Sequence, residues 1–171
     1  MTRLGAGLRL AAAIAFAAAG AGASQAADVH VAVAANFTGA AKEIAAKFEA
    51  ATGDTAVLSF GSTGQLFTQI SQGAPFDVFL AADQARPEKA VADGLAVADS
   101  RFTYATGKIV LYSTDPSLVS GEETLKDGSF EKLAIANPAT APYGAAAVQA
   151  MKGLGVYDDL APKLVQGTNI A

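Results

Sequence analysis

The chain has 171 residues, of which 51% are hydrophobic and 16% are charged, so it has enough apolar material for a globular core and too much for a disordered chain. It contains no cysteine, which excludes disulfides, thiolate chemistry and zinc sites of the cysteine type. Its 16 acidic residues outnumber its 12 basic ones, so it lacks the basic surplus that nucleic-acid binding requires.

The N-terminal residues 1–26 have the pattern of a secretory signal peptide. Arg3 and Arg9 precede an apolar run over residues 10–19, and small residues follow up to Ala26, where we expect cleavage. The run is too short to span a bilayer, so we expect no membrane insertion after cleavage; a retained anchor is the alternative. Removing the two arginines leaves 10 basic residues against 16 acidic ones, a net charge of −6.

Short apolar runs alternate with helical spacing in the first half of the chain. In the first helix, an apolar face is predicted for Ala40, Ile44, Ala45 and Phe48. The runs predict strands over 29–34, 56–60 and 77–82, and the spacing predicts helices from Ala40 to Gly53, over 63–72 and around Pro87. Strands that alternate with helices indicate an α/β fold with mostly parallel sheets, in which ligands collect at the carboxyl ends of the strands.

The second half repeats this alternation less regularly. We predict strands over 108–113, 132–136 and 165–167, and helices near Leu125, over 145–151 and over 160–164. A domain crossing near Thr106 and Gly107 would divide the chain into a first lobe, residues 27–105, and a second lobe, residues 106–171. Residues 168–171 carry a helix-start signal with no helix behind it, so we expect a truncated product whose second lobe is incomplete.

The stretch Ser59–Leu66 is the strongest candidate for a binding turn. It is expected to end a buried strand, turn through two glycines and begin a helix. A helix start offers unpaired backbone N–H groups and partial positive charge, which suit an anion. The alternative is that Ser62 or Thr63 only caps its own helix.

Three strand-to-helix junctions share an unusual composition. Residues 34–41, 59–74 and 135–151 contain no Asp, Glu or Arg. A fully ionised tetrahedral oxyanion needs only donors, whereas a protonated phosphate also needs an acceptor for its proton. An amino acid would need a guanidinium for its carboxylate and an acid for its amine. The junctions therefore favour an oxyanion.

Signatures of catalysis are scarce. Ser62 lacks the G-x-S-x-G spacing of a nucleophile elbow, and the single histidine, His30, precedes it and is best explained as an ordinary strand residue. Tyr143 is best explained by aromatic packing or as a hydroxyl donor. We expect a protein that is not an enzyme and has no cofactor and no metal cation; a secreted serine hydrolase that uses Ser62 is the alternative.

Three motifs resemble the periplasmic molybdate-binding proteins of ABC importers: Ala34–Thr38, Ser59–Leu66 and Gln72–Asp83. The Gly-Ala-Pro-x-Asp-Val-Phe block within the third is shared with receptors for tungstate and other oxyanions. The resemblance implies a class II periplasmic binding protein with two α/β lobes and a hinge. It also implies a monomer that captures molybdate or tungstate in the periplasm and delivers it to a membrane permease.

The resemblance also implies the binding residues. The first ligand position falls on Asn36, the hydroxyl position falls on Thr63 with Ser62 beside it, and the position after the proline falls on Tyr143. A backbone donor falls on Ile170, whereas the family's later tyrosine ligand has no counterpart. Two alternatives remain within binding and structural proteins: a receptor for another tetrahedral oxyanion such as sulfate, and a structural or signalling relic that no longer closes.

Overall fold

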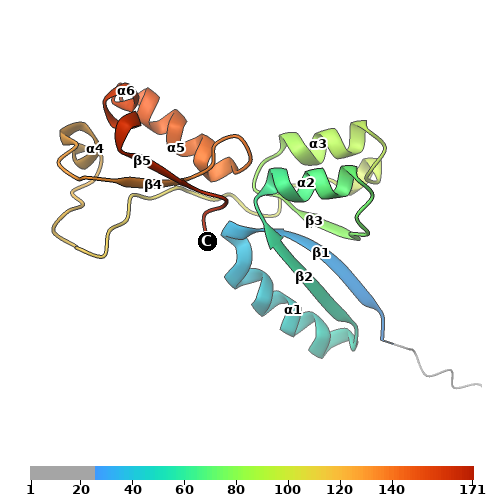
Figure 1. Cartoon of the computed structure of the whole chain (residues 1–171). Coiled ribbons are helices and arrows are strands. Elements are labelled where there is room, and N and C mark those ends of the chain that lie inside the picture. The colour runs from blue at the N-terminus through green and yellow to red at the C-terminus, as the bar shows by residue number, and fades with distance from the viewer. Residues whose placement is uncertain (1–25) are drawn as a thin grey trace, which may run out of the picture.

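The computed structural model describes residues 26–171, which form two parallel sheets, each with its own helices (Figure 1). The predicted signal peptide lies outside the described residues except for its last position, Ala26. Within the described part of the chain, no helix combines the length and the apolarity that a membrane crossing needs.

The first lobe is built on a three-stranded sheet in the order β2-β1-β3. Its strands are β1 (Asp28–Ala34), β2 (Thr55–Gly61) and β3 (Val78–Leu80). Its helical elements are the 3₁₀ turn η1 (Ala35–Phe37), the helices α1 (Thr38–Thr52), α2 (Thr63–Ser71) and α3 (Ala85–Ala92), and a second 3₁₀ turn η2 (Ala98–Ser100). Each strand predicted in this half is present, with bounds that differ by no more than two residues at either end.

The strand order explains why helices cover both faces of this sheet. The chain moves from β1 to β2 on one side and returns past β1 to β3, so right-handed crossovers place α1 on one face and α2 on the other (Figure 1). Val31 and Val33 pack with Ala41 of α1. The alternate residues Ala32 and Ala34, which are buried, therefore point to the α2 face, where their small side chains permit close packing.

The second lobe has a smaller sheet of two parallel strands, β4 (Leu133–Ala136) and β5 (Leu164–Gly167). Its core is formed by Met151, Val156 and Leu160. The other elements are the helices α4 (Glu123–Asp127), α5 (Pro142–Gly153) and α6 (Tyr157–Leu160) and the 3₁₀ turn η3 (Ala161–Lys163). The two sheets with separate cores confirm the α/β class with mostly parallel strands, whereas the boundary near residue 106 stays a prediction.

Two sequence predictions are wrong in detail. The segment 108–113 is not a strand: it runs as irregular chain between the lobes, since no neighbouring strand among the described residues offers it a hydrogen-bonding ladder. The apolar face of α1 is also rotated from the predicted one. Ala41 is buried, whereas Ile44 is 55% exposed and Ala40 is exposed, because Val31 and Val33 of β1 pack against Ala41.

Candidate functional site

The carboxyl ends of the three strands of the first lobe meet at one edge of the sheet. Ala34 pairs with Gly61, and Val33 pairs with Leu80, so the residues that follow each strand emerge side by side. Asn36 lies two residues beyond β1, and Ser62 lies one residue beyond β2. The parallel register thus brings these two predicted binding residues to the edge that faces the second lobe (Figure 1).

Ser62 is occupied by a capping box at the start of α2. Its hydroxyl donates to Oε1 of Gln65 at 2.9 Å and accepts the backbone N–H of Gln65 at 3.4 Å. The backbone N–H of Ser62 donates to the same Oε1 at 3.3 Å. Ser62 therefore satisfies the helix end in the way that the capping alternative predicted, and its hydroxyl proton already has an acceptor.

Thr63 is fully buried and ties α2 to the end of β3. Its Oγ1 accepts the backbone N–H of Ala82 at 3.0 Å, which uses a lone pair of the hydroxyl and leaves its proton available. Within the described residues, the backbone N–H of Thr63 has no acceptor either, as expected for the first position of a helix. Of the two hydroxyls at this turn, that of Thr63 is the one free to donate.

Tyr143 comes from the second lobe and touches Asn36. It is the second residue of α5, which begins at Pro142, a residue suited to a first helical position. The next residue, Gly144, packs against the backbone of Ala136 so closely that a side chain would collide with its carbonyl oxygen. This close approach positions the start of α5 and with it Tyr143. The Tyr143 hydroxyl accepts the Nδ2–H of Asn36 at 3.4 Å.

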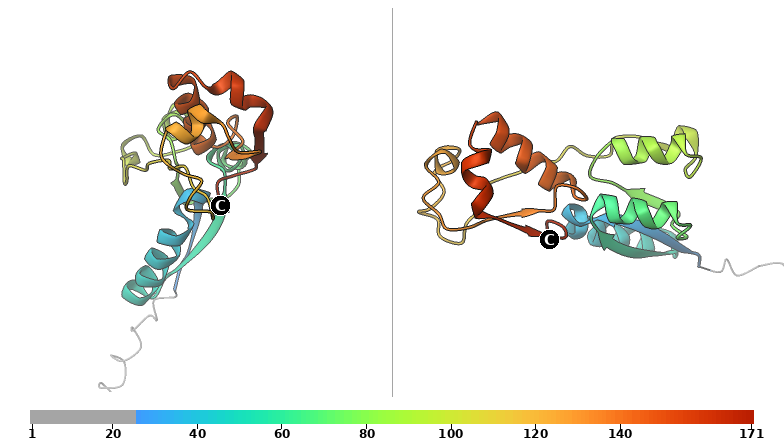
Figure 2. Two further views of the ribbon diagram at one scale, coloured as in Figure 1. Left: turned by 90° about the vertical axis from the view of Figure 1, so that its left-hand side faces the viewer. Right: turned by 45° about the horizontal axis from the view of Figure 1, so that its top comes forward.

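Ile170 lies in the exposed segment that follows β5. Its side chain is 48% exposed, and its neighbour Ala171 donates its backbone N–H to Oδ1 of Asn169 at 2.9 Å. In all three views the C-terminal end of the chain lies beside the start of α1 (Figures 1 and 2). The last residues thus reach the same region between the lobes as Asn36.

An ion pair that was not predicted from the sequence lies beside the start of α2. Asp83 accepts the backbone N–H of Arg86 at 3.0 Å through Oδ1, and Oδ2 pairs with the Arg86 guanidinium. The second guanidinium nitrogen, Nη2, lies 3.1 Å from the position that a side-chain carbon on Gly64 would take. The three junctions themselves contain no Asp, Glu or Arg, but the fold brings this ion pair beside one of them, where the two charges neutralise each other. The Asp-x-x-Arg spacing at a helix start was the signal in the sequence.

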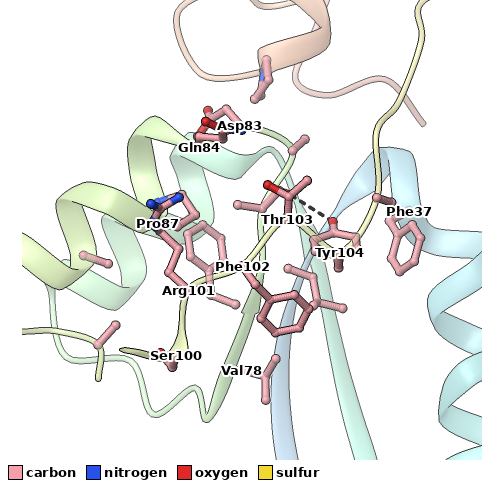
Figure 3. A pocket seen from close by; sticks show the side chains of 18 of the residues that line it. Phe37, Val78, Asp83, Gln84, Pro87, Ser100, Arg101, Phe102, Thr103 and Tyr104 are labelled. Atoms are coloured by element: carbon pink, nitrogen blue, oxygen red, sulfur yellow. Dashed lines mark hydrogen bonds between the residues drawn. The ribbon is translucent and has the colours of Figure 1, made fainter. Parts of the chain in front are cut away.

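A groove of about 1390 Å³ runs from Asn36 and Tyr143 along β3 and α3 (Figure 3). Its lining is largely apolar, and Phe102 lies over Val78 in the close view. The rings of Phe37 and Tyr104 are 5.1 Å apart, and the Tyr104 hydroxyl donates to the carbonyl oxygen of Ala81 at 2.9 Å. Burial, together with nearby Tyr143, raises the pKa of Tyr104. Ser62 and Thr63 do not line this groove.

The described residues contain no cluster of three or more His, Asp or Glu side chains that would hold a metal cation. Of the predicted binding residues, Asn36 and Tyr143 line the groove and offer neutral donors, one from each lobe, whereas Ser62 and Thr63 are buried at the start of α2. A family model described as bacterial extracellular solute-binding protein matches residues 29–171. The chain belongs to this family.

Individual relatives agree with this assignment. The chain is 55% identical over 146 residues to the molybdate-binding protein ModA of Rhodobacter capsulatus, an alignment that covers 85% of this chain and 58% of that protein. It is 54% identical over 169 residues to ModA of Azotobacter vinelandii, with 98% of this chain and 63% of that protein covered. The chain thus spans about three fifths of the length of these relatives.

Solved structures give the same result. The periplasmic molybdate-binding protein of Azotobacter vinelandii matches with a TM-score of 0.80 at 40% identity, over 82% of this chain and 62% of that one. The substrate-binding domain of a putative molybdenum ABC transporter from Clostridium difficile matches with a TM-score of 0.62 at 27% identity, over 84% and 63%. The predicted resemblance and the predicted fold are both confirmed.

Proposed function

We propose that this chain is the part of an exported solute-binding protein that captures molybdate or tungstate and delivers it to the permease of an ABC importer. The observation that carries the proposal is the contact between Asn36 and Tyr143, since it joins predicted binding residues from two separate lobes at 3.4 Å. The names of the relatives support molybdate as the cargo.

The chemistry of the donors favours a fully ionised oxyanion. The Asn36 amide, the free hydroxyl proton of Thr63 and the Tyr143 hydroxyl are neutral donors, and the start of α2 adds partial positive charge. The carboxylate of Asp83 is paired with Arg86 through both of its oxygens, so it is a poor acceptor for a protonated phosphate. A dianion that carries no proton would therefore be preferred, and Ile170 is proposed to add a backbone donor from the second lobe.

Three further features belong to this proposal. The protein acts in the periplasm after its signal peptide is removed near Ala26, it works as a monomer, and it performs no catalysis. The oxyanion is its cargo, and no cofactor is needed. Delivery to the permease requires that the lobes close over the ligand and open again, a hinge motion that contacts to both lobes would drive.

Calorimetric titration with molybdate, tungstate, sulfate and phosphate tests the ligand. The chain has no tryptophan, so heat is a better signal than intrinsic fluorescence. We expect binding of molybdate and tungstate with a stoichiometry of one, and weaker or no binding of sulfate and phosphate. Preferential binding of sulfate would support the alternative receptor for another oxyanion, and binding of phosphate alone would refute the donor-only argument.

The serine hydrolase alternative receives no geometric support. His30 pairs with Val57 near the start of β2, whereas Ser62 lies five residues further along, a separation of about 16 Å at strand spacing. The Ser62 hydroxyl donates to Gln65 and not to a base. A serine-directed phosphonate that labels the wild-type chain covalently but does not label Ser62→Ala would nevertheless establish a reactive Ser62. That result would contradict the proposal.

A further inference from the structure

The two lobes touch at a second place, apart from Asn36 and Tyr143. The backbone N–H of Gly64, in the first turn of α2, donates to the carbonyl oxygen of Thr140 at 2.8 Å. Nη2 of Arg86 donates to the carbonyl oxygen of Ala139 at 3.3 Å. Two consecutive carbonyl groups of the second lobe are therefore held by two donors of the first lobe.

We propose that these residues form a latch that stabilises the closed arrangement of the two lobes. The latch consists of Gly64, Asp83 and Arg86 in the first lobe and of Ala139 and Thr140 in the second. The proposal rests on the two-lobed architecture of the proposed function and not on the identity of the anion.

The second-lobe side of the latch is fixed within its own lobe. Oδ1 of Asn137 accepts the backbone N–H of Ala139 at 2.9 Å, and its backbone carbonyl accepts those of Thr140 and Ala141 at 3.2 and 2.8 Å. Asn137 in turn donates its own N–H to the carbonyl of Gly167 at the end of β5, at 2.8 Å. The two carbonyl groups are thus presented by a rigid turn.

The first-lobe side is equally organised. Asp83 accepts both the backbone N–H and the guanidinium of Arg86, which leaves Nη2 directed at the second lobe. Thr63 anchors the start of α2 to Ala82, next to Asp83. Because each side is held by hydrogen bonds within its own lobe, the contact should form with little loss of conformational freedom.

Glycine is required at position 64 for this contact. A side-chain carbon there would lie 2.8 Å from the carbonyl oxygen of Thr140 and 3.1 Å from its Cα, and both are backbone atoms that cannot move aside by rotating a side chain. Gly64 lies inside a helix, where alanine is the more stabilising residue. The Gly64→Ala variant should therefore favour α2 and oppose the latch at the same time.

Distance measurement between two spin labels tests the latch in the absence of ligand. Because the chain has no cysteine, Gln69→Cys on α2 and Gln149→Cys on α5 give two unique and exposed labelling positions, one on each lobe. We expect a closed and an open population in the parent chain, with the closed one giving the short distance and the larger share. Arg86→Gln and Gly64→Ala should each lower the ratio of closed to open molecules by about tenfold. Arg86→Gln loses the charged hydrogen bond to the carbonyl oxygen of Ala139, and Gly64→Ala loses the hydrogen bond to the carbonyl oxygen of Thr140.

Two matched controls isolate the latch. Lys89→Gln removes a charge from the same helix as Arg86, but among residues 26–171 the ion pair of Lys89 is with Asp93 of its own lobe. Gly39→Ala changes the second residue of α1, the equivalent of Gly64 in α2, where the added carbon meets open space. Both controls should keep the parental distance, and Gly64→Ala should unfold at no lower temperature than the parent.

An unchanged distance in Arg86→Gln and Gly64→Ala would overturn the latch, as would an equal change in the two controls. The measurement needs no anion, so a failed molybdate titration would leave it intact. Conversely, a chain without a latch could still bind molybdate. The two proposals therefore fail independently.

Discussion

Replacing Thr63 tests the two roles that this residue holds, each through its own measurement. Its hydroxyl accepts the N–H of Ala82 and, in the proposed function, donates its proton to the oxyanion. Thr63→Val keeps the volume of the side chain and removes both roles. Thr63→Ser keeps the hydroxyl and removes one buried methyl group, which makes it the matched control.

The structure gives the magnitudes. Thr63 is fully buried and its bond to Ala82 is 3.0 Å long, so Thr63→Val should lower the free energy of unfolding by about 1–2 kcal/mol because the N–H loses its partner. Thr63→Ser should cost about 1 kcal/mol through the lost methyl group. The two variants thus differ little in stability. Because the Thr63 hydroxyl is proposed to donate to a charged ligand, Thr63→Val should also weaken molybdate binding by about 1.5–3 kcal/mol, whereas Thr63→Ser should not.

Two measurements decide the case. Amide hydrogen exchange at Ala82 should accelerate in Thr63→Val and stay slow in Thr63→Ser, which reports the structural bond directly. Calorimetric titration with molybdate reports the second role. If Thr63→Val loses the protection of Ala82 and yet binds molybdate as tightly as Thr63→Ser, the hydroxyl of Thr63 is structural only, and the assignment of Thr63 as the donor is refuted.

Three further predictions follow from the same contacts. Ser62→Ala removes the capping box and should lower the free energy of unfolding by about 1 kcal/mol in urea titration, with Ser62→Thr as the control; unchanged stability would contradict the capping role. Tyr143→Phe should weaken molybdate binding by about 1.5–3 kcal/mol in calorimetry, whereas Tyr112→Phe, 78% exposed, should have no effect; equal affinities would remove Tyr143 from the site. Burial raises the pKa of Tyr104, so the folded chain keeps the phenolic proton at pH values at which the unfolded chain has released it. The stability that the group contributes is therefore complete below about pH 10 and falls as the pH rises further, and urea titrations from pH 9 to 11 should show a smaller loss in Tyr104→Phe.

The elements of the first lobe were predictable because their signals are local. The β-branched run in β1 and the apolar spacing in α2 each indicate one structure, and the register then follows from parallel pairing. The segment 108–113 shows the limit of this reasoning. Ile109, Val110 and Tyr112 favour a strand as strongly as β1 does, but a strand also needs a partner, and here none of the described strands lies beside them.

The candidate site was predictable in its positions and not in its contacts. Strand ends locate Asn36 and Ser62, whereas Tyr143, the second residue of α5, follows only from the family resemblance. The bond from Arg86 to Ala139 joins residues 53 positions apart, and it exists only because the two lobes meet. No local pattern contains that information, so the sequence predicted a junction free of charge where the structure has a charged neighbour.

This neighbour changes the reason for which the proposed site would suit a dianion. The argument from sequence was the absence of charge, and the structure replaces it with paired charges. Asp83 neutralises Arg86, and each of the two side chains also makes one hydrogen bond to the backbone. An unpaired arginine at this place would attract any anion, and an unpaired aspartate would repel all of them or accept a proton from phosphate. Because the pair does neither, the proposed function leaves discrimination to the neutral donors, while Nη2 of the guanidinium bonds to the second lobe. The same ion pair would thereby keep the proposed binding surface neutral and supply a contact between the lobes.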